Sequence, residues 1–169
     1  MKIKSQFKNR SEGMVDYIYR EDSDPMEDLD GKILQAVHGF CFYGDKLVVV
    51  YANDKGYWTF PGGGIEPEET YEQAVIREVQ EESNMKVLHQ ELIGYIDVYE
   101  KDRVIRQNRS FCVVEPYGDF INDPDNDITE IKLIDPKNYG EYVKWGEIGD
   151  IIMDRAVELK DKFYNINRT

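Results

Sequence analysis

The chain has 169 residues, of which 41% are hydrophobic and 33% charged, and this balance is typical of one folded domain with its own core. Its net charge is −13, from 34 acidic against 21 basic side chains. This charge argues against broad binding to nucleic acid or to anionic membrane, since both need a basic surface. A small anionic substrate stays compatible with it if a bound metal ion supplies local positive charge.

No segment resembles a targeting sequence or a membrane span. Residues 1–10 are polar and lack the apolar stretch of a signal peptide. No apolar run approaches the roughly 20 residues that a membrane helix needs. We therefore expect a cytoplasmic protein without membrane contact.

Residues 1–30 carry the weakest secondary-structure signal, and we treat them as an N-terminal extension. Within them, residues 14–19 favour a short strand, and the acidic, proline-containing stretch 21–31 favours a loop.

Three strands are predicted next, in residues 33–43, 46–51 and 58–60. Gly44 and Asp45 predict a tight hairpin turn between the first two. The third strand ends at a proline that is followed by three glycines.

A helix follows the glycines. Thr70 is a good N-cap, and Gln73 completes a capping box with it. Asn84 stands where a left-handed residue is expected to end the helix. Apolar residues at helical spacing predict the buried face, namely Tyr71, Ala74, Val75 and Val79.

Further strands are predicted in residues 92–99, 109–114 and 128–134, and an amphipathic helix closes the chain. The order strands, helix, strands, helix predicts an α+β fold in which a mixed sheet has helices on both faces, an α/β/α sandwich. We assign residues 31–169 to this single domain.

Three carboxylates gather near the end of the first predicted helix. Glu78, Glu81 and Glu82 fall within an arc of roughly 100° around the helix axis. Like charges at such spacing repel, and the helix C-terminus is already negative. A solvated helix face is the simpler interpretation, but a hard divalent cation such as Mg²⁺ or Mn²⁺ would turn this repulsion into binding.

From Gly63 to Met85 the chain reads G-x5-E-x7-R-E-U-x-E-E-x-N-U, where x is any residue and U an apolar one. This resembles the signature box of the Nudix hydrolases at every fixed position except the last glycine, which is Asn84 here. Asn tolerates the left-handed backbone better than most other residues, so the departure removes no metal ligand. The resemblance implies a Nudix-like fold and hydrolysis of a nucleoside diphosphate linked to another group, with Mg²⁺ or Mn²⁺.

The resemblance also implies roles for individual residues. Glu81 and Glu82 would be direct metal ligands, and Glu78 a ligand or the group that orients or deprotonates the attacking water. A backbone carbonyl of Gly62 or Gly63 would approach the metal. Arg77 would orient a carboxylate, and Glu69 and Gly64 would give structural support. An additional acidic ligand would come from a distant segment, with Glu130 as the first choice and Glu115 as the second.

Other side chains have two open interpretations, and in each case the structural one is favoured. Three aromatic residues near the glycines are expected in the core, although they could stack on a nucleobase. Three arginines near a later strand are expected on a solvated strand edge, although they could meet phosphates. The histidines are expected to be structural or exposed, and the cysteines to be reduced core thiols. These residues are Tyr57, Trp58 and Phe60; Arg103, Arg106 and Arg109; His38 and His89; Cys41 and Cys112.

The sequence thus favours a metal-dependent hydrolase that cleaves the diphosphate linkage of a nucleoside tri- or diphosphate derivative by attack of activated water on phosphorus. A sensor module that binds a nucleotide without turnover is the main alternative. Removal of a cap or of pyrophosphate from the 5′ end of RNA is a weaker alternative because the chain is so acidic. We expect a small-molecule nucleotide as partner, and whether the chain forms a homodimer is left open.

Overall fold

The computed structural model describes residues 1–9, 13–121, 124–125 and 127–167. Within these residues, nine strands form one sheet. The elements are, in chain order, β1 (Lys2–Asn9), β2 (Gly13–Glu21), β3 (Lys32–Tyr43), β4 (Lys46–Ala52), β5 (Tyr57–Thr59), β6 (Gly62–Gly64), α1 (Tyr71–Ser83), β7 (Met85–Tyr99), β8 (Val104–Pro116), β9 (Ile128–Ile134), the 3₁₀ helix η1 (Pro136–Glu141) and α2 (Gly146–Ile166).

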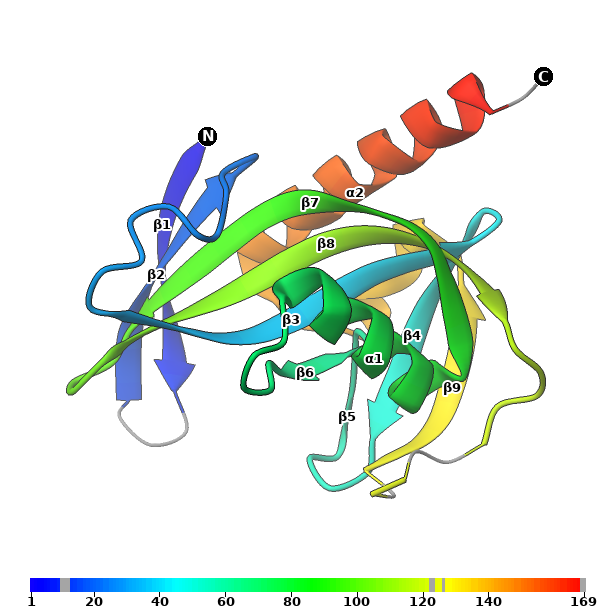
Figure 1. The fold of residues 1–169 in the computed structure, drawn as a ribbon, viewed down its shortest axis with the longest axis horizontal. Coiled ribbons are helices and arrows are strands. Elements are labelled where there is room, and N and C mark those ends of the chain that lie inside the picture. The colour runs from blue at the N-terminus through cyan, green and yellow to red at the C-terminus, as the bar shows by residue number, and fades with distance from the viewer. Residues whose placement is uncertain (10–12, 122–123, 126, 168–169) are drawn as a thin grey trace.

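The sheet is mixed, and the two long helices lie on its opposite faces (Figure 1). Its strand order is β1-β2-β7-β8-β3-β4-β5, with β6 paired to β3 and β9 paired to β4. The central pair β3 and β8 is parallel, and the other pairs are antiparallel. The predicted α/β/α sandwich with a mixed sheet is therefore confirmed.

Strand β3 contributes side chains to the apolar clusters on both faces of the sheet. Val37 and Cys41 belong to the apolar cluster under α1, whereas Phe40 and Phe42 belong to the larger cluster under α2. This follows from the alternation of side chains along a strand. Because both faces are covered there, residues 40–42 are consecutively apolar and buried rather than alternating.

Helix α1 forms as its end signals predict. The Thr70 hydroxyl accepts from the Gln73 N–H, and the Gln73 side chain accepts from the Thr70 N–H. At the other end, Asn84 adopts the left-handed conformation, with φ 54° and ψ 39°. The expected buried face is present, since Ala74, Val75 and Val79 are buried. The helix is thus fixed at both ends and along one side, which holds its carboxylates in place.

The N-terminal segment contributes more than the sequence indicated. The strand expected in residues 14–19 is part of β2, but β1 was not predicted. The apolar pattern of β1 is weak, because Ile3 and Phe7 are the two described residues of this strand that pack against the core cluster under α2. The β1–β2 hairpin pairs through β2 with β7 and extends the sheet. Strands β7 and β8 are also longer than predicted.

The expectation of a solvated strand edge is wrong for Arg106 and Arg109, which are both buried. The reason is topological, because β8 lies between β7 and β3 in the middle of the sheet. The cysteines follow their prediction: Cys41 and Cys112 are free and buried, and they face each other in register on β3 and β8. Among the described residues, no helix has both the length and the apolar character that crossing a bilayer requires.

Candidate active site

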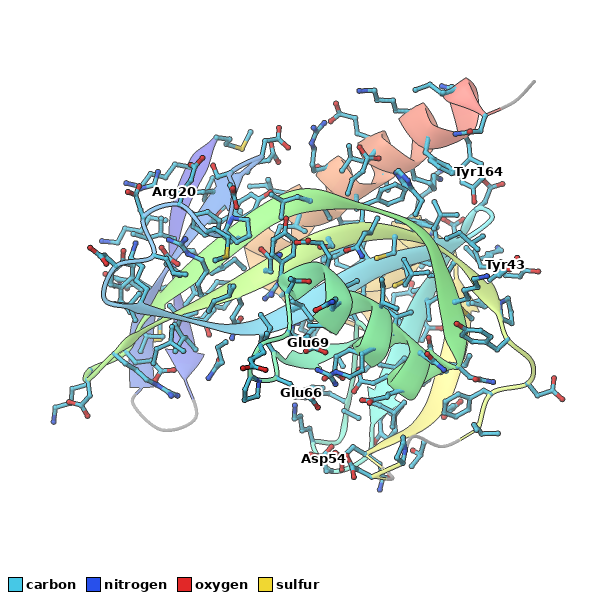
Figure 2. The ribbon with its side chains drawn as sticks, in the orientation of Figure 1. Arg20, Tyr43, Asp54, Glu66, Glu69 and Tyr164 are labelled. Atoms are coloured by element: carbon cyan, nitrogen blue, oxygen red, sulfur yellow. The ribbon has the colours of Figure 1, made fainter. Side chains whose placement is uncertain are left out.

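A cavity of about 920 Å³ extends from the glycine strand β6 and α1 toward the start of α2. One end is acidic and includes Glu66, Glu78, Glu81 and Glu82. The other end is aromatic and receives side chains from the N-terminal hairpin, β5 and the start of α2. Figure 2 shows Glu66 and Glu69 ahead of α1 on the side of the molecule where Asp54 also lies.

Arg77 forms hydrogen bonds to several groups at the acidic end. Its Nη1 donates to Glu78 at 2.9 Å and to Glu81 at 3.2 Å. Its Nε and Nη2 donate to Glu69 at 2.8 and 2.9 Å, and Nη2 also donates to the Gly64 carbonyl oxygen at 2.8 Å. These bonds raise the pKa of Arg77, and they lower the pKa of the Glu69 carboxyl. Arg77 thereby joins α1 to the glycine strand.

Glu78 lies against the glycine strand and is only 12% exposed. A methyl group built on Gly63 would lie 2.6 Å from Glu78 Oε1, so only glycine leaves room for the carboxylate. Burial raises the pKa of Glu78, and the opposing effect of Arg77 is smaller. Glu82 contacts the same strand, because its Oε1 accepts from the Gly62 N–H at 2.7 Å.

The donor atoms at this end suit a hard divalent cation. They are carboxylate oxygens beside a glycine backbone, and the Glu78 carboxylate lies directly against Gly63. In the described part of the chain, no three Asp, Glu, His or Cys side chains converge closely enough to hold a metal ion. The reason is local: Arg77 binds Glu78 and Glu81, while the Gly62 N–H binds Glu82. The site therefore fits such an ion in its chemistry, once these carboxylates turn toward it.

The two acids suggested as an extra ligand do not lie in the cavity. Glu130 is exposed on β9, opposite Tyr51 of β4, and Glu115 is exposed on β8, opposite Lys86. Two other acids, Asp125 and Asp127, line the cavity instead. Both come from the acid-rich stretch just before β9, and their place in that stretch was the only signal that could have indicated them. A metal role for Glu130 stays a prediction.

The aromatic end includes all three residues for which core and ligand roles were left open. Phe60 is buried in the core, with its ring centroid 4.9 Å from that of Trp145. Trp58 is half-buried between Tyr51 and Tyr142, at centroid distances of 5.4 and 5.7 Å. Tyr57 is exposed at the rim, so the structural interpretation is right for Phe60 and wrong for Tyr57. All three line the cavity.

Arg109 lies at the floor of the aromatic end. Its Nη1 donates to His38 Nδ1 at 3.2 Å and to the Asn108 carbonyl oxygen at 3.1 Å, and its Nη2 donates to Gln107 Oε1 at 3.1 Å. Because arginine only donates, His38 must accept at Nδ1 and is therefore neutral. The pKa of His38 lies well below its usual value, first through burial and then through Arg109. Sequence reasoning identified neither residue as part of the cavity.

The comparisons with known proteins agree with this fold. The chain belongs to the NUDIX domain family, whose model matches residues 32–154. It is 39% identical over 75 residues to YtkD of Bacillus subtilis, covering 44% of this chain and 47% of that protein. It is 38% identical over 77 residues to the 8-oxo-dGTP diphosphatase of Proteus vulgaris, covering 46% of this chain and 61% of that protein. The matches thus span less than two thirds of the length of these relatives.

Solved structures support the architecture over a longer range. The pyrophosphohydrolase BsRppH of Bacillus subtilis superposes with a TM-score of 0.69 at 23% identity, covering 91% of this chain and 96% of that chain. An Ap4A hydrolase of C. elegans gives a TM-score of 0.60 at 15% identity, covering 77% of this chain and 99% of that chain. At these identities the likeness concerns the fold alone.

Proposed function

We propose that this chain is a metal-dependent hydrolase that cleaves the diphosphate linkage of a nucleoside tri- or diphosphate derivative. The observation that carries the proposal is the single cavity with two chemically different ends. One end has Glu78, Glu81 and Glu82 against a glycine strand, and the other is walled by aromatic side chains. A nucleotide has the same two parts, a charged phosphate chain and a planar base.

Glu78, Glu81 and Glu82 would hold Mg²⁺ or Mn²⁺, together with a backbone carbonyl of Gly62 or Gly63. When bound, the ion neutralises phosphate charge and makes water a better nucleophile. Asp125 and Asp127 line the same cavity and are candidates for a further ligand, beside the predicted Glu130. Binding of the ion would require Glu81 and Glu82 to turn from their present donors, Arg77 and the Gly62 N–H, whereas Glu78 can offer Oε2 while its Oε1 keeps the bond from Arg77.

The reaction adds one water to one P–O–P linkage. The water oxygen forms a bond to phosphorus, the bridging P–O bond breaks, and the bridging oxygen leaves with the second phosphate. Glu78 is the candidate for accepting the proton of the water, because burial raises its pKa toward the working range of a general base. Arg77 would orient Glu78 through the bond from its Nη1.

The substrate class is supported by relatives as well as by shape. The Proteus vulgaris relative is named an 8-oxo-dGTP diphosphatase, and we extend nucleoside triphosphates to this chain as candidate substrates. A cytoplasmic location also stays a prediction, as does the choice between monomer and homodimer.

The test is release of phosphate or pyrophosphate from a nucleotide panel with Mg²⁺ or Mn²⁺. We expect Glu82→Gln and Glu78→Gln each to reduce kcat by roughly 10²–10⁴-fold. Glu72→Gln is the matched control, because Glu72 lies on α1 but does not line the cavity, and its kcat should equal that of the wild type. Absence of turnover on every diphosphate compound would overturn the proposal. Tight nucleotide binding without turnover would then indicate the sensor module.

A further inference from the structure

The aromatic end of the cavity has a buried cation, Arg109, and among the residues that the structure describes no carboxylate forms a hydrogen bond or ion pair with it. Arg109 is 4% exposed, and its hydrogen bonds go to a histidine nitrogen, a backbone carbonyl and an amide oxygen. None of these acceptors carries a negative charge. Burying an unpaired charge costs free energy, so a fold selected for stability alone would not keep it.

The guanidinium also has donor capacity left over. Arginine has five N–H groups, and three are used in the bonds described above. Nε is buried and has no hydrogen-bond partner, and Nη2 uses only one of its two N–H groups. Nε–H and one Nη2–H lie along the same edge of the planar group, where they suit two acceptor atoms side by side.

The surroundings of this edge suit a flat ring. The guanidinium lies over the Trp145 ring, 4.7 Å from its centroid, and Phe7 and Tyr17 from the N-terminal hairpin line the same end. The Phe7 and Tyr17 rings contact each other at a centroid distance of 4.8 Å. Lys55 and Lys144 also line the cavity, but the edge of Arg109 lies among apolar rings, and a planar base fits both the rings and the donors.

We propose that Arg109 reads the base of the nucleotide and selects 6-oxopurines, that is guanine and hypoxanthine. Their O6 and N7 are two adjacent acceptors, the pattern that arginine binds with both donors of one edge. Adenine presents an amino donor beside N7 and cannot pair in this way. This inference rests on the proposed function, since it identifies which nucleotides occupy that same site.

The first experiment measures binding without metal, so that no turnover is needed. The chain has two tryptophans, and both line the cavity, so quenching of their fluorescence reports on occupancy. The probes are GMP, IMP, AMP, 7-deaza-GMP and tripolyphosphate. We expect GMP and IMP to bind at least about 10-fold more tightly than AMP. 7-Deaza-GMP, which lacks the N7 acceptor, should bind more weakly than GMP.

Variants then assign the preference to Arg109. Arg109→Met should bring GMP and AMP to within about 2-fold of each other. Arg109→Lys should also lose most of the preference, because an ammonium keeps the charge but lacks the two-donor edge. Arg103→Met removes an exposed arginine outside the cavity and should keep the wild-type preference. If Arg109→Met does not fold, the base preference of Arg109→Lys and the binding of GMP, IMP, AMP and 7-deaza-GMP by the wild type still test the inference.

Three results would overturn the inference: equal binding of GMP and AMP by the wild type, a preference that persists in both Arg109 variants, or competition by tripolyphosphate at the concentrations where GMP binds. The failure of the proposed function looks different. In that case the base preference is present, but no nucleotide is hydrolysed with Mg²⁺ or Mn²⁺.

Discussion

Arg106 and Arg109 lie three residues apart on β8 and point to opposite faces of the sheet, and within the described part of the chain only Arg106 of the two has a carboxylate partner. Arg106 Nε donates to Asp97 at 2.8 Å, and further bonds reach the carbonyl oxygens of Pro25 and Glu27. Lys32 also contacts Asp97, at 3.1 Å. Arg106 thus has a structural role, fixing the segment before β3, whereas the bonds of Arg109 leave its charge unmatched.

Methionine in place of each arginine should therefore have unequal effects on stability. Arg106→Met leaves the Asp97 carboxylate buried with Lys32 as its remaining cationic partner, and we expect a loss of about 3–5 kcal/mol. Arg109→Met removes an uncompensated charge along with its hydrogen bonds, and the loss should be less than half as large. Urea unfolding measures both. Equal losses of stability in the two variants would show that the role of Arg109 is mainly structural.

The glycine strand offers a graded series. Gly63→Ala should abolish most activity but leave the protein folded, because the new methyl group meets the Glu78 carboxylate, which is the end of a side chain. Gly64→Ala is the matched control, since its methyl group meets only the Gln35 carbonyl oxygen at 3.9 Å. Gly62→Ala meets the backbone of Val37 and should reduce stability. Thermal melts and kcat separate the three, and an active Gly63→Ala enzyme would contradict the role given to Glu78.

Glu78 should make stability depend on pH in a defined direction. Its pKa in the folded protein is raised above the ordinary 4.5, so the folded state binds more protons than the unfolded chain just above that value. Stability should therefore fall as the pH rises from about 4.5 through the folded pKa, and the loss persists at pH 7. Glu78→Gln should flatten this part of the profile in metal-free buffer. An unchanged slope in urea unfolding between pH 4 and 7 would contradict it.

Metal binding should offset the loss of stability that burial of the Glu78 carboxylate causes. An ion that binds the folded state alone raises the free energy of unfolding, by about 2.7 kcal/mol at a concentration 100-fold above its Kd. We expect Mg²⁺ or Mn²⁺ to raise the Tm of the wild type, and to raise it much less in Glu82→Gln. Glu72→Gln, again the control, should respond like the wild type. A Tm that is insensitive to both ions would argue against the metal site.

Asn84 stands where the signature that this sequence resembles has a glycine, and its backbone is in the left-handed conformation that glycine accepts most easily. Its φ of 54° is left-handed, and its side chain donates to the Asp119 carbonyl oxygen at 2.8 Å. Asn84→Gly should change stability by less than about 1 kcal/mol, because relief of strain offsets the lost bond. Asn84→Ala keeps the strain and loses the bond, so it should cost about 1–2 kcal/mol. Thermal unfolding of both variants measures these changes in stability. A glycine variant that is less stable than the alanine variant would refute this account.

Helix α1 and its carboxylates could be predicted because their signals are local. The capping box at Thr70, the left-handed Asn84 and the apolar spacing each lie within the helix or next to it, and the structure has all of them. The strands β3 and β4 were equally readable, since both are nearly continuous apolar runs with a glycine turn between them.

The aromatic end could not be predicted because long-range pairing creates it. Arg109 looked like part of a polar strand edge, and only the position of β8 between β7 and β3 buries it. Asp127 and Trp145 reach the cavity from segments far from the glycine box. The sequence prediction of Glu130, with Glu115 as the second choice, rests on no information about how β9 pairs with β4, and it is Asp127 that lines the cavity.

The N-terminal hairpin lies outside residues 32–154, the range that the family model matches, yet Phe7 and Tyr17 form part of the cavity wall. Phe7 also approaches Gly146 at the start of α2, where a methyl group would lie 3.2 Å from its ring. The aromatic wall is therefore encoded partly outside the range that the family model matches, whereas Arg109 and the glutamates of α1 lie inside it. Substitutions at Phe7 or Tyr17 should therefore alter which ligands the aromatic end accepts and leave the carboxylate end of the cavity unchanged.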